Sequence, residues 1–380
     1  MREDPARRGL LYAGTQHGVY LSQDDGATWQ SLSLNMPDVP VSDLIVEGNE
    51  LVISTHGRSF WVLDNIAPLR QINAAALATE ASLFQPPVGV RSGPGVVLSW
   101  WQKTAPRQAR LEILDSSNAV VRSFEPDTTP RAVRDSLAAS GGGGRRNRVF
   151  LPDTAGLNQL YWDLRAEGPS TFPGMILWGA GTGGPALPPG RYTVRLTRDG
   201  SVLSQPMRIV RNPRITDVTD ADLQAQYAFS RRVRDKVTEA NDAVIAIRRV
   251  KAQLEDRYKQ STDAALHAAG DSLKSRASAV EGDIYQVRNR SNQDPLNFPI
   301  KVNNRLANLM SMAERGDGRP TTNMPEIFQI LSDELKGYTT RLAKIWAEDL
   351  EAVNRELTRL KLERLDPKCP KPAGCPPPAA

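Results

Sequence analysis

Hydrophobic and polar residues alternate in short runs near the start of the chain. Residues 10–34 contain three such runs, and residues 41–72 contain four more, VSDLIVE, ELVISTH, SFWVLD and PLRQI. Turn residues separate the runs, and alternation with a period of two is typical of half-buried strands. The pattern predicts seven successive short β-strands.

A second β-rich stretch covers residues 93–212. The runs GVVLSWW, ARLEILDSSNAVVRSFE, LNQLYWDLR and GRYTVRLTRDGSVLSQPMRIV alternate between turn signals, which is the pattern of a β-sandwich. Two inserts interrupt it, at residues 131–148 and at residues 169–186, the second rich in Gly and Pro. The SGGGGRRNR of the first insert lacks the order of a phosphate-binding loop, so it predicts a flexible connection.

From about residue 219 the apolar positions recur every three or four residues, which predicts amphipathic helices. Thr219 is a suitable N-cap for the first helix. Four helices with short connections predict an antiparallel bundle over residues 217–365, and we interpret the apolar stripes as core seams. The stripe of the last helix runs through Leu331, Leu335, Tyr338, Leu342, Ile345, Leu350, Val353 and Leu357.

The stretch SQDDGATW has the form of a tight hairpin turn. Asp24 can accept hydrogen bonds from turn N–H groups, and Gly26 can supply a positive φ. The residues of the pattern are Ser22, Asp24, Gly26, Thr28 and Trp29, and Thr28 would begin a strand that carries Trp29 into the core. This order resembles the Asp-box, or BNR repeat, of sialidases, sortilin-type receptors and related β-propellers. We expect Asp24 to be a structural turn residue and not a catalytic acid.

A longer resemblance covers nearly the whole chain. VSDLIVEGNELVISTHGRSFWVLDN resembles the last blade of large bacterial proteins with a sortilin-like (VPS10-like) propeller, often labelled glycosyl hydrolase. YWDLR and LPPGRYTVRL resemble the Ig-like modules that follow such propellers, and DPLNFPIKVNNRLANL is typical of the C-terminal region of the same family. The resemblance implies about two propeller blades at residues 1–75, an Ig-like β-sandwich at 93–212 and a helical bundle at 217–365.

A propeller closes with about four to eight blades, whereas residues 1–75 supply fewer than two. We therefore expect the chain to be the C-terminal part of a longer protein. Relatives of the family are exported, which implies a periplasmic or secreted location for the full-length protein. MREDPARRGLLYAG has no apolar signal-peptide region, which fits a truncated start.

The THGR stretch offers the candidate ligand-facing residues His56 and Arg58. In one interpretation they face the propeller channel and bind an anionic or sugar ligand. In the other, which we favour, Gly57 makes the turn while the two basic side chains bond loop carbonyls and carboxylates such as Asp64.

Composition excludes several classes of protein. A formal charge of +5 arises from 48 basic and 43 acidic residues scattered along 380 positions, which argues against nucleic-acid binding. There is no apolar run of ~18 residues, hence no transmembrane segment. Cys369 and Cys375 lie in the Pro-rich tail at 366–380, which we expect to be disordered. A disulfide between them is compatible with export, and a metal site is disfavoured because further ligands are lacking.

Catalysis demands residues that this sequence does not assemble. An ordinary glycosidase needs two facing carboxylates, whereas a sialidase needs an arginine cluster, a Tyr nucleophile with its Glu partner, and an acid. We assign no catalytic residue, metal or cofactor. Two hypotheses remain: a non-catalytic part of an exported propeller protein that binds a protein, peptide or glycan, or the C-terminal part of a sialidase-like glycoside hydrolase whose catalytic residues lie upstream.

Overall fold

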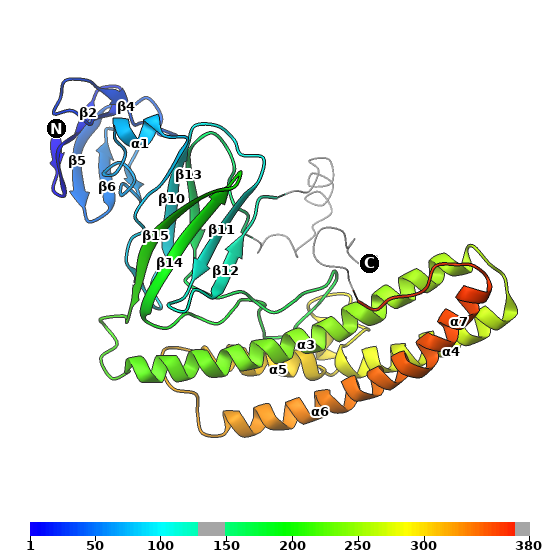
Figure 1. The fold of residues 1–380 in the computed structure, drawn as a ribbon. Coiled ribbons are helices and arrows are strands. Elements are labelled where there is room, and N and C mark those ends of the chain that lie inside the picture. The colour runs from blue at the N-terminus through cyan, green and yellow to red at the C-terminus, as the bar shows by residue number, and fades with distance from the viewer. Residues whose placement is uncertain (128–148, 369–380) are drawn as a thin grey trace. The chain divides into compact units, whose positions relative to one another are not determined.

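The computed structural model describes residues 1–127 and 149–368, and it shows β-sheets followed by a C-terminal helical region (Figure 1). The chain divides into two compact units. The β unit takes Met1–Thr129, Val149–Leu164 and Gly190–Val210, and the helical unit takes Arg165–Pro189 and the chain after Val210. The insert at 131–148 lies outside the described residues, as do Cys369, Cys375 and most of the predicted tail.

Two small antiparallel sheets open the β unit, in the orders β1-β2-β3-β4 and β5-β6-β7. They share one core, in which Leu10, Tyr12 and Val19 meet Leu44 and Leu51. Gly14 is needed where they meet, because a Cβ there would lie 2.5 Å from Val41 Cγ1. The strands are β1 (Arg2–Asp4), β2 (Arg7–Thr15), β3 (Gly18–Ser22), β4 (Gln30–Ser31), β5 (Val41–Glu47), β6 (Glu50–Thr55) and β7 (Phe60–Leu63).

The predicted strands differ from the observed ones at both ends of this region. The run PLRQI forms turns and no strand, because the backbone N–H groups of Gln71 and Ile72 both donate to Pro68 O, at 2.9 Å. A short strand over Arg2–Asp4 was not predicted, and it pairs with β2 through a register shift.

The second pair of sheets has the orders β13-β10-β8 and β12-β11-β14-β15-β9. The two sheets meet at one edge, where Gln205 Nε2 of β15 donates to Leu83 O of β8 at 2.9 Å. Asp199 and Gly200 form the β14–β15 turn, both with positive φ, as an Asp-Gly pair favours. The elements are α1 (Ala74–Ala78), β8 (Ala81–Leu83), β9 (Gly89–Val90), β10 (Val96–Gln102), β11 (Ala109–Leu114), β12 (Val120–Phe124), β13 (Gly156–Trp162), β14 (Gly190–Arg198) and β15 (Ser201–Val210).

The helical unit confirms the predicted helices as a bundle. Thr219 caps α3 as expected, with its side chain accepting from the backbone N–H of Asp222. α3 packs against α4 and α5, and α6 packs against both. The helices are α3 (Asp220–Tyr258), α4 (Ala264–Ile284), a 3-10 turn at Asp294–Leu296, α5 (Val302–Ala313), α6 (Met324–Ile345), a π-helical turn at Trp346–Leu350 and α7 (Glu351–Arg359).

The second insert belongs to the helical unit and not to the β-sheets that flank it in sequence. Residues 169–180, which we call the strap, carry no regular secondary structure and supply Phe172 to the core of the bundle. Arg165 and the N–H of Ala186, on either side of the strap, both donate to Glu314 Oε2, at 2.9 and 3.0 Å.

Candidate functional site

The SQDDGATW turn between β3 and β4 is closed by side-chain hydrogen bonds. Asp24 accepts from the backbone N–H of Thr28 at 2.8 Å, from its hydroxyl at 2.6 Å and from the Ser22 hydroxyl at 2.8 Å. Ser22 Oγ in turn accepts from the N–H of Gly26 at 2.9 Å. Asp25 and Gly26 adopt positive φ values of 58° and 92°, which complete the tight turn.

These bonds fix the charge state of Asp24. The hydrogen bond from the Thr28 hydroxyl, followed by the one from the Thr28 N–H, holds the pKa of the Asp24 carboxyl below its usual range. A general acid at neutral pH needs a raised pKa instead. The geometry therefore favours a turn-forming role over an acid role for Asp24.

Trp29 does not enter the core, contrary to expectation. It is 38% exposed, and its Nε1 donates to Gly26 O at 3.1 Å. The strand after the turn is only Gln30–Ser31 and begins two residues after Thr28, so Trp29 stays on the turn.

The loop between β6 and β7 presents His56 and Arg58. Positive φ at Gly57 and Ser59 bends the chain, and Thr55 Oγ1 fixes the bend by donating to Ser59 O at 2.7 Å. Both basic side chains are exposed, and within residues 1–127 and 149–368 neither makes a hydrogen bond or an ion pair. The contact with Asp64 expected from the sequence is therefore not formed.

One face of the β5-β6-β7 sheet beside this loop is apolar. Ile45, Val52 and Val62 lie opposite one another across the three strands, and Phe60 follows on the same face of β7. Phe60 is 74% exposed, Ile45 54% and Val62 48%, while Val52 is half-buried. We call these four residues the outer face. The opposite face carries Leu44 and Ile53, which are buried in the shared core.

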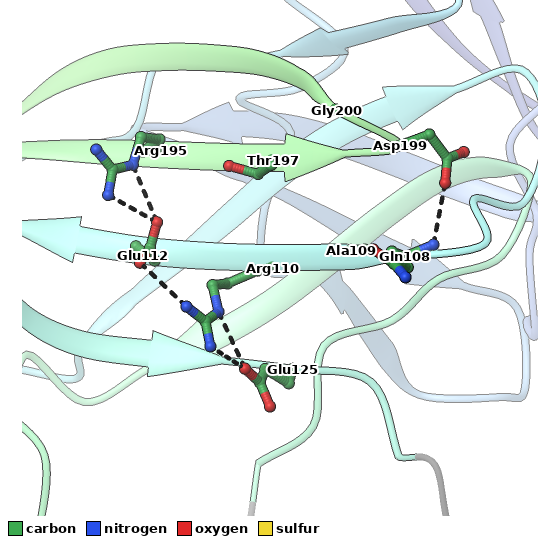
Figure 2. A pocket seen from close by; sticks show the side chains of 9 residues that line it. All are labelled: Gln108, Ala109, Arg110, Glu112, Glu125, Arg195, Thr197, Asp199 and Gly200. Atoms are coloured by element: carbon green, nitrogen blue, oxygen red, sulfur yellow. Dashed lines mark hydrogen bonds and ion pairs between the residues drawn. The ribbon is translucent and has the colours of Figure 1, made fainter. Parts of the chain in front are cut away.

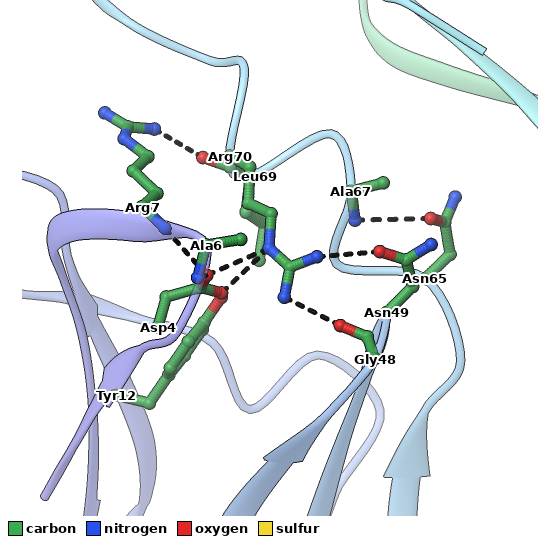
Figure 3. A network of polar contacts seen from close by, with 10 residues as sticks. All are labelled: Asp4, Ala6, Arg7, Tyr12, Gly48, Asn49, Asn65, Ala67, Leu69 and Arg70. Atoms are coloured by element: carbon green, nitrogen blue, oxygen red, sulfur yellow. Dashed lines mark hydrogen bonds and ion pairs between the residues drawn. The ribbon is translucent and has the colours of Figure 1, made fainter. Parts of the chain in front are cut away.

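A polar network joins the two small sheets (Figure 3). The Asp4 side chain is fully buried and lies 3.0 Å from Nε of Arg70, and the Tyr12 hydroxyl donates to it at 3.1 Å. The other guanidinium nitrogens of Arg70 reach Asn49 Oδ1 and Gly48 O, both at 2.7 Å. Burial raises the pKa of Tyr12, so its hydroxyl remains a donor. Every group is paired, as a buried charge requires, and the network reads as structural.

A shallow depression of about 560 Å³ lies on the five-stranded sheet, lined by β11, β14, the turn after β14 and Glu125, which follows β12 (Figure 2). Arg195 lies 2.8 Å from Glu112, and Arg110 bridges Glu112 at 3.7 Å and Glu125 at 2.5 Å. The arginines and glutamates are thus already paired with one another along the sheet. Such a ladder offers a ligand little uncompensated charge, so the depression is a weaker candidate than the outer face.

Within residues 1–127 and 149–368, no three or more His, Cys, Asp or Glu side chains are grouped to hold a metal ion. In the same residues, no helix has the length and apolar character needed to cross a membrane. The three histidines lie far apart along the chain. His17 pairs with Asp38 at 3.1 Å, His267 contacts Ser261 O at 3.0 Å, and His56 lies in the β6–β7 loop.

Comparison with known proteins adds little. No family model matches the chain, and no curated protein matches it. Among solved structures, one titled "Biofilm associated protein - BSP domain" is 12% identical, with a TM-score of 0.16, and the match covers 52% of this chain and 21% of that chain. The chain thus spans about a fifth of that structure's length, and a likeness this low carries no argument.

The structure also contains contacts that the sequence did not point to. Asn241, Asn303 and Asn304 are buried between the strap and the helices, and Asn241 lies on the apolar stripe of α3 between Val237 and Val244. A polar residue on an apolar stripe was the available signal, because a buried amide must find hydrogen-bond partners.

Proposed function

We propose that this chain is the non-catalytic, ligand-binding part of an exported propeller protein, with a protein, peptide or glycan as its ligand. In this proposal the two small sheets are the last blades of a propeller, and the sheets of residues 93–212 form an Ig-like sandwich. The Asp-box hairpin and the antiparallel order β1-β2-β3-β4 support the blade assignment.

The observation that carries the binding proposal is the outer face. Large apolar side chains gathered on one exposed sheet face are typical of interaction sites, whereas single exposed ones are ordinary. Phe60 alone is 74% exposed, and His56 and Arg58 flank it with unpaired basic groups. An apolar centre with a basic rim favours a peptide or protein segment that carries apolar and acidic side chains.

The test compares surface variants of the full chain. Phage-displayed random peptides and an immobilised glycan panel serve as the probes. We expect selected binders to lose at least about tenfold in affinity on Phe60→Ser, because burying a Phe ring is worth about 1.5–3 kcal/mol. The double variant His56→Ala, Arg58→Ala should also weaken them, most strongly at low salt.

Val202→Ser is the matched control, because Val202 is 58% exposed on a different sheet. Binding that survives the outer-face variants, or that Val202→Ser weakens equally, contradicts the proposal. Hydrolysis of any member of a panel of fluorogenic glycosides would instead support the glycoside hydrolase alternative.

A further inference from the structure

The strap lies along the bundle as a bound peptide lies in a groove, and it makes one turn, in which the Met175 N–H donates to Phe172 O at 3.2 Å. Residues 169–180 contact α3, α5 and the C-terminal end of α4 through named hydrogen bonds and through Phe172, although they form no helix or strand. Phe172 is 5% exposed, whereas Thr171 and Pro173 on either side of it are exposed. The bundle therefore buries Phe172 as the anchor and leaves its two neighbours in solvent, while Met175, Leu177 and Ala180 pack partly buried against the same core.

The anchor pocket is built from an aromatic ring and a cation. The Phe172 ring meets the Tyr285 ring edge to face, with centroids 5.0 Å apart, and the Arg248 guanidinium lies 4.7 Å from the Phe172 centroid. Glu281 holds Arg248 in place at 2.7 Å. A second nitrogen of Arg248 donates to Pro173 O at 3.3 Å. Such ring and cation contacts favour an aromatic anchor over an aliphatic one.

The other contacts are hydrogen bonds between helix side chains and the backbone of the strap. Asn241 Nδ2 donates to Ser170 O at 2.7 Å. The Tyr285 hydroxyl donates to Gly174 O and accepts from the Ile176 N–H, both at 3.1 Å. Burial raises the pKa of Tyr285, which keeps the donated proton in place.

Asn304 completes the series by bonding both backbone groups of Trp178. Its Oδ1 accepts from the N–H at 2.7 Å, and its Nδ2 donates to the carbonyl at 3.0 Å. The bonded backbone groups belong to residues 170, 173, 174, 176 and 178, so they follow the strap along its length and past the turn in which the Met175 N–H donates to Phe172 O at 3.2 Å. Main-chain bonds supply affinity for a peptide that adopts the backbone path of the strap, and the anchor pocket supplies specificity.

We propose that the groove between α3, α4 and α5 is a peptide-binding site, that the strap is its built-in occupant, and that the groove accepts in trans a peptide with the same Phe-Pro anchor and turn. This site is independent of the outer face. The covalently joined strap acts at a high effective concentration, so it outcompetes added peptide in the native chain. A weakened strap anchor shifts that competition in favour of the added peptide.

The experiment measures fluorescence anisotropy of a labelled peptide with the sequence of residues 168–181, GPSTFPGMILWGAG, added to full-length variants. We expect Phe172→Ala to bind the peptide at least about tenfold more tightly than the native chain. The double variant Phe172→Ala, Asn304→Ala should lose most of that gain. A peptide with Ala in place of its Phe should bind at least about tenfold more weakly than the parent peptide.

Phe84→Ala is the matched control, since it removes an equally buried ring from the β unit. It should bind the peptide no better than the native chain. Equal binding by the native chain and Phe172→Ala overturns the proposal, as does equal binding of the parent and Ala peptides. Phe172→Leu replaces Phe172→Ala if the latter loses its helical circular dichroism, and the same ranking is then required.

Discussion

Asp24 illustrates how a single carboxylate can fix a turn while staying at the surface. Its two oxygens receive three hydrogen bonds from Ser22 and Thr28, and these bonds favour the charged form. We expect Asp24→Ala to lower the melting temperature of the β unit at neutral pH, because the turn loses the acceptor that closes it.

The pH dependence of that effect has a definite sign. The folded-state pKa of Asp24 lies below the ordinary value of 3.8, so its stabilisation is present above that value and is lost as the pH falls through the folded-state pKa. Tryptophan fluorescence during thermal unfolding should show the gap between native chain and variant shrinking below about pH 4. Asp64→Ala, at another exposed carboxylate of these sheets, is the control. A gap that persists unchanged in acid would count against this account.

The hydrogen bonds and ion pairs of a side chain were predictable from sequence only where its bonding partners are close along the chain. The hydrogen bonds of Asp24 join residues two and four apart, and the SQDDGATW pattern indicated that turn. Arg70 and Asp4 are 66 residues apart, and nothing local to either residue indicates the other. The Asn304–Trp178 bonds span 126 residues for the same reason.

The π-helical turn at Trp346–Leu350 explains the one irregular step in the last helix. Ile345 and Leu350 are both buried although they are five residues apart, where an α-helix would bury residues three or four apart. The extra residue is absorbed in the π turn, so the stripes of α6 and α7 face the same core.

Deletion of Ala347 should therefore be tolerated, because Ile345 and the former Leu350 would then be four residues apart, as an α-helix requires. We expect it to lower the free energy of unfolding by less than about 1.5 kcal/mol. Deletion of Ala243 within α3 is the control, since it rotates one half of the stripe by about 100° and should cost more than about 3 kcal/mol. Chemical denaturation followed by far-UV circular dichroism compares the two, and equal losses would contradict the role of the π turn.

The N-cap of α3 also makes a testable contribution to stability. Thr219 and Asp222 bond each other's backbone N–H groups, and the side-chain hydrogen bond from Thr219 lowers the pKa of Asp222 to about 2. Thr219→Ala should cost about 1 kcal/mol of stability, as the loss of an N-cap usually does. Thr219→Ser is the control and should restore most of it in denaturant titrations. An Ala variant as stable as the native chain would show that the cap contributes nothing.

For the whole molecule, the division into two units predicts two separable unfolding events. Leu98 is fully buried in the β unit and Leu335 in the helical unit. Replacing either by Ala should cost about 2–5 kcal/mol and shift one calorimetric transition by roughly 5 to 15 °C while leaving the other in place. Both variants moving the same single transition would contradict independent unfolding.

Hydrophobic periodicity predicted most of the strands and the helices, although PLRQI forms turns and β1 was not predicted, and it placed the start of the helices near residue 219 correctly. It could not assign the strap, because a Gly- and Pro-rich stretch has no period from which a partner could be inferred. Its position between two strand runs suggested an insert of the β region. Its side-chain contacts instead place it in the helical unit.

The strap is synthesised before most of the helical side chains that bind it. Trp178 leaves the ribosome 126 residues before Asn304, the side chain that bonds its backbone. At about 5–20 residues per second this separation corresponds to roughly 6 to 25 seconds of translation. During that interval Phe172 and Leu177 have no groove to enter, so the nascent chain displays a short apolar segment of the kind that holdase chaperones bind.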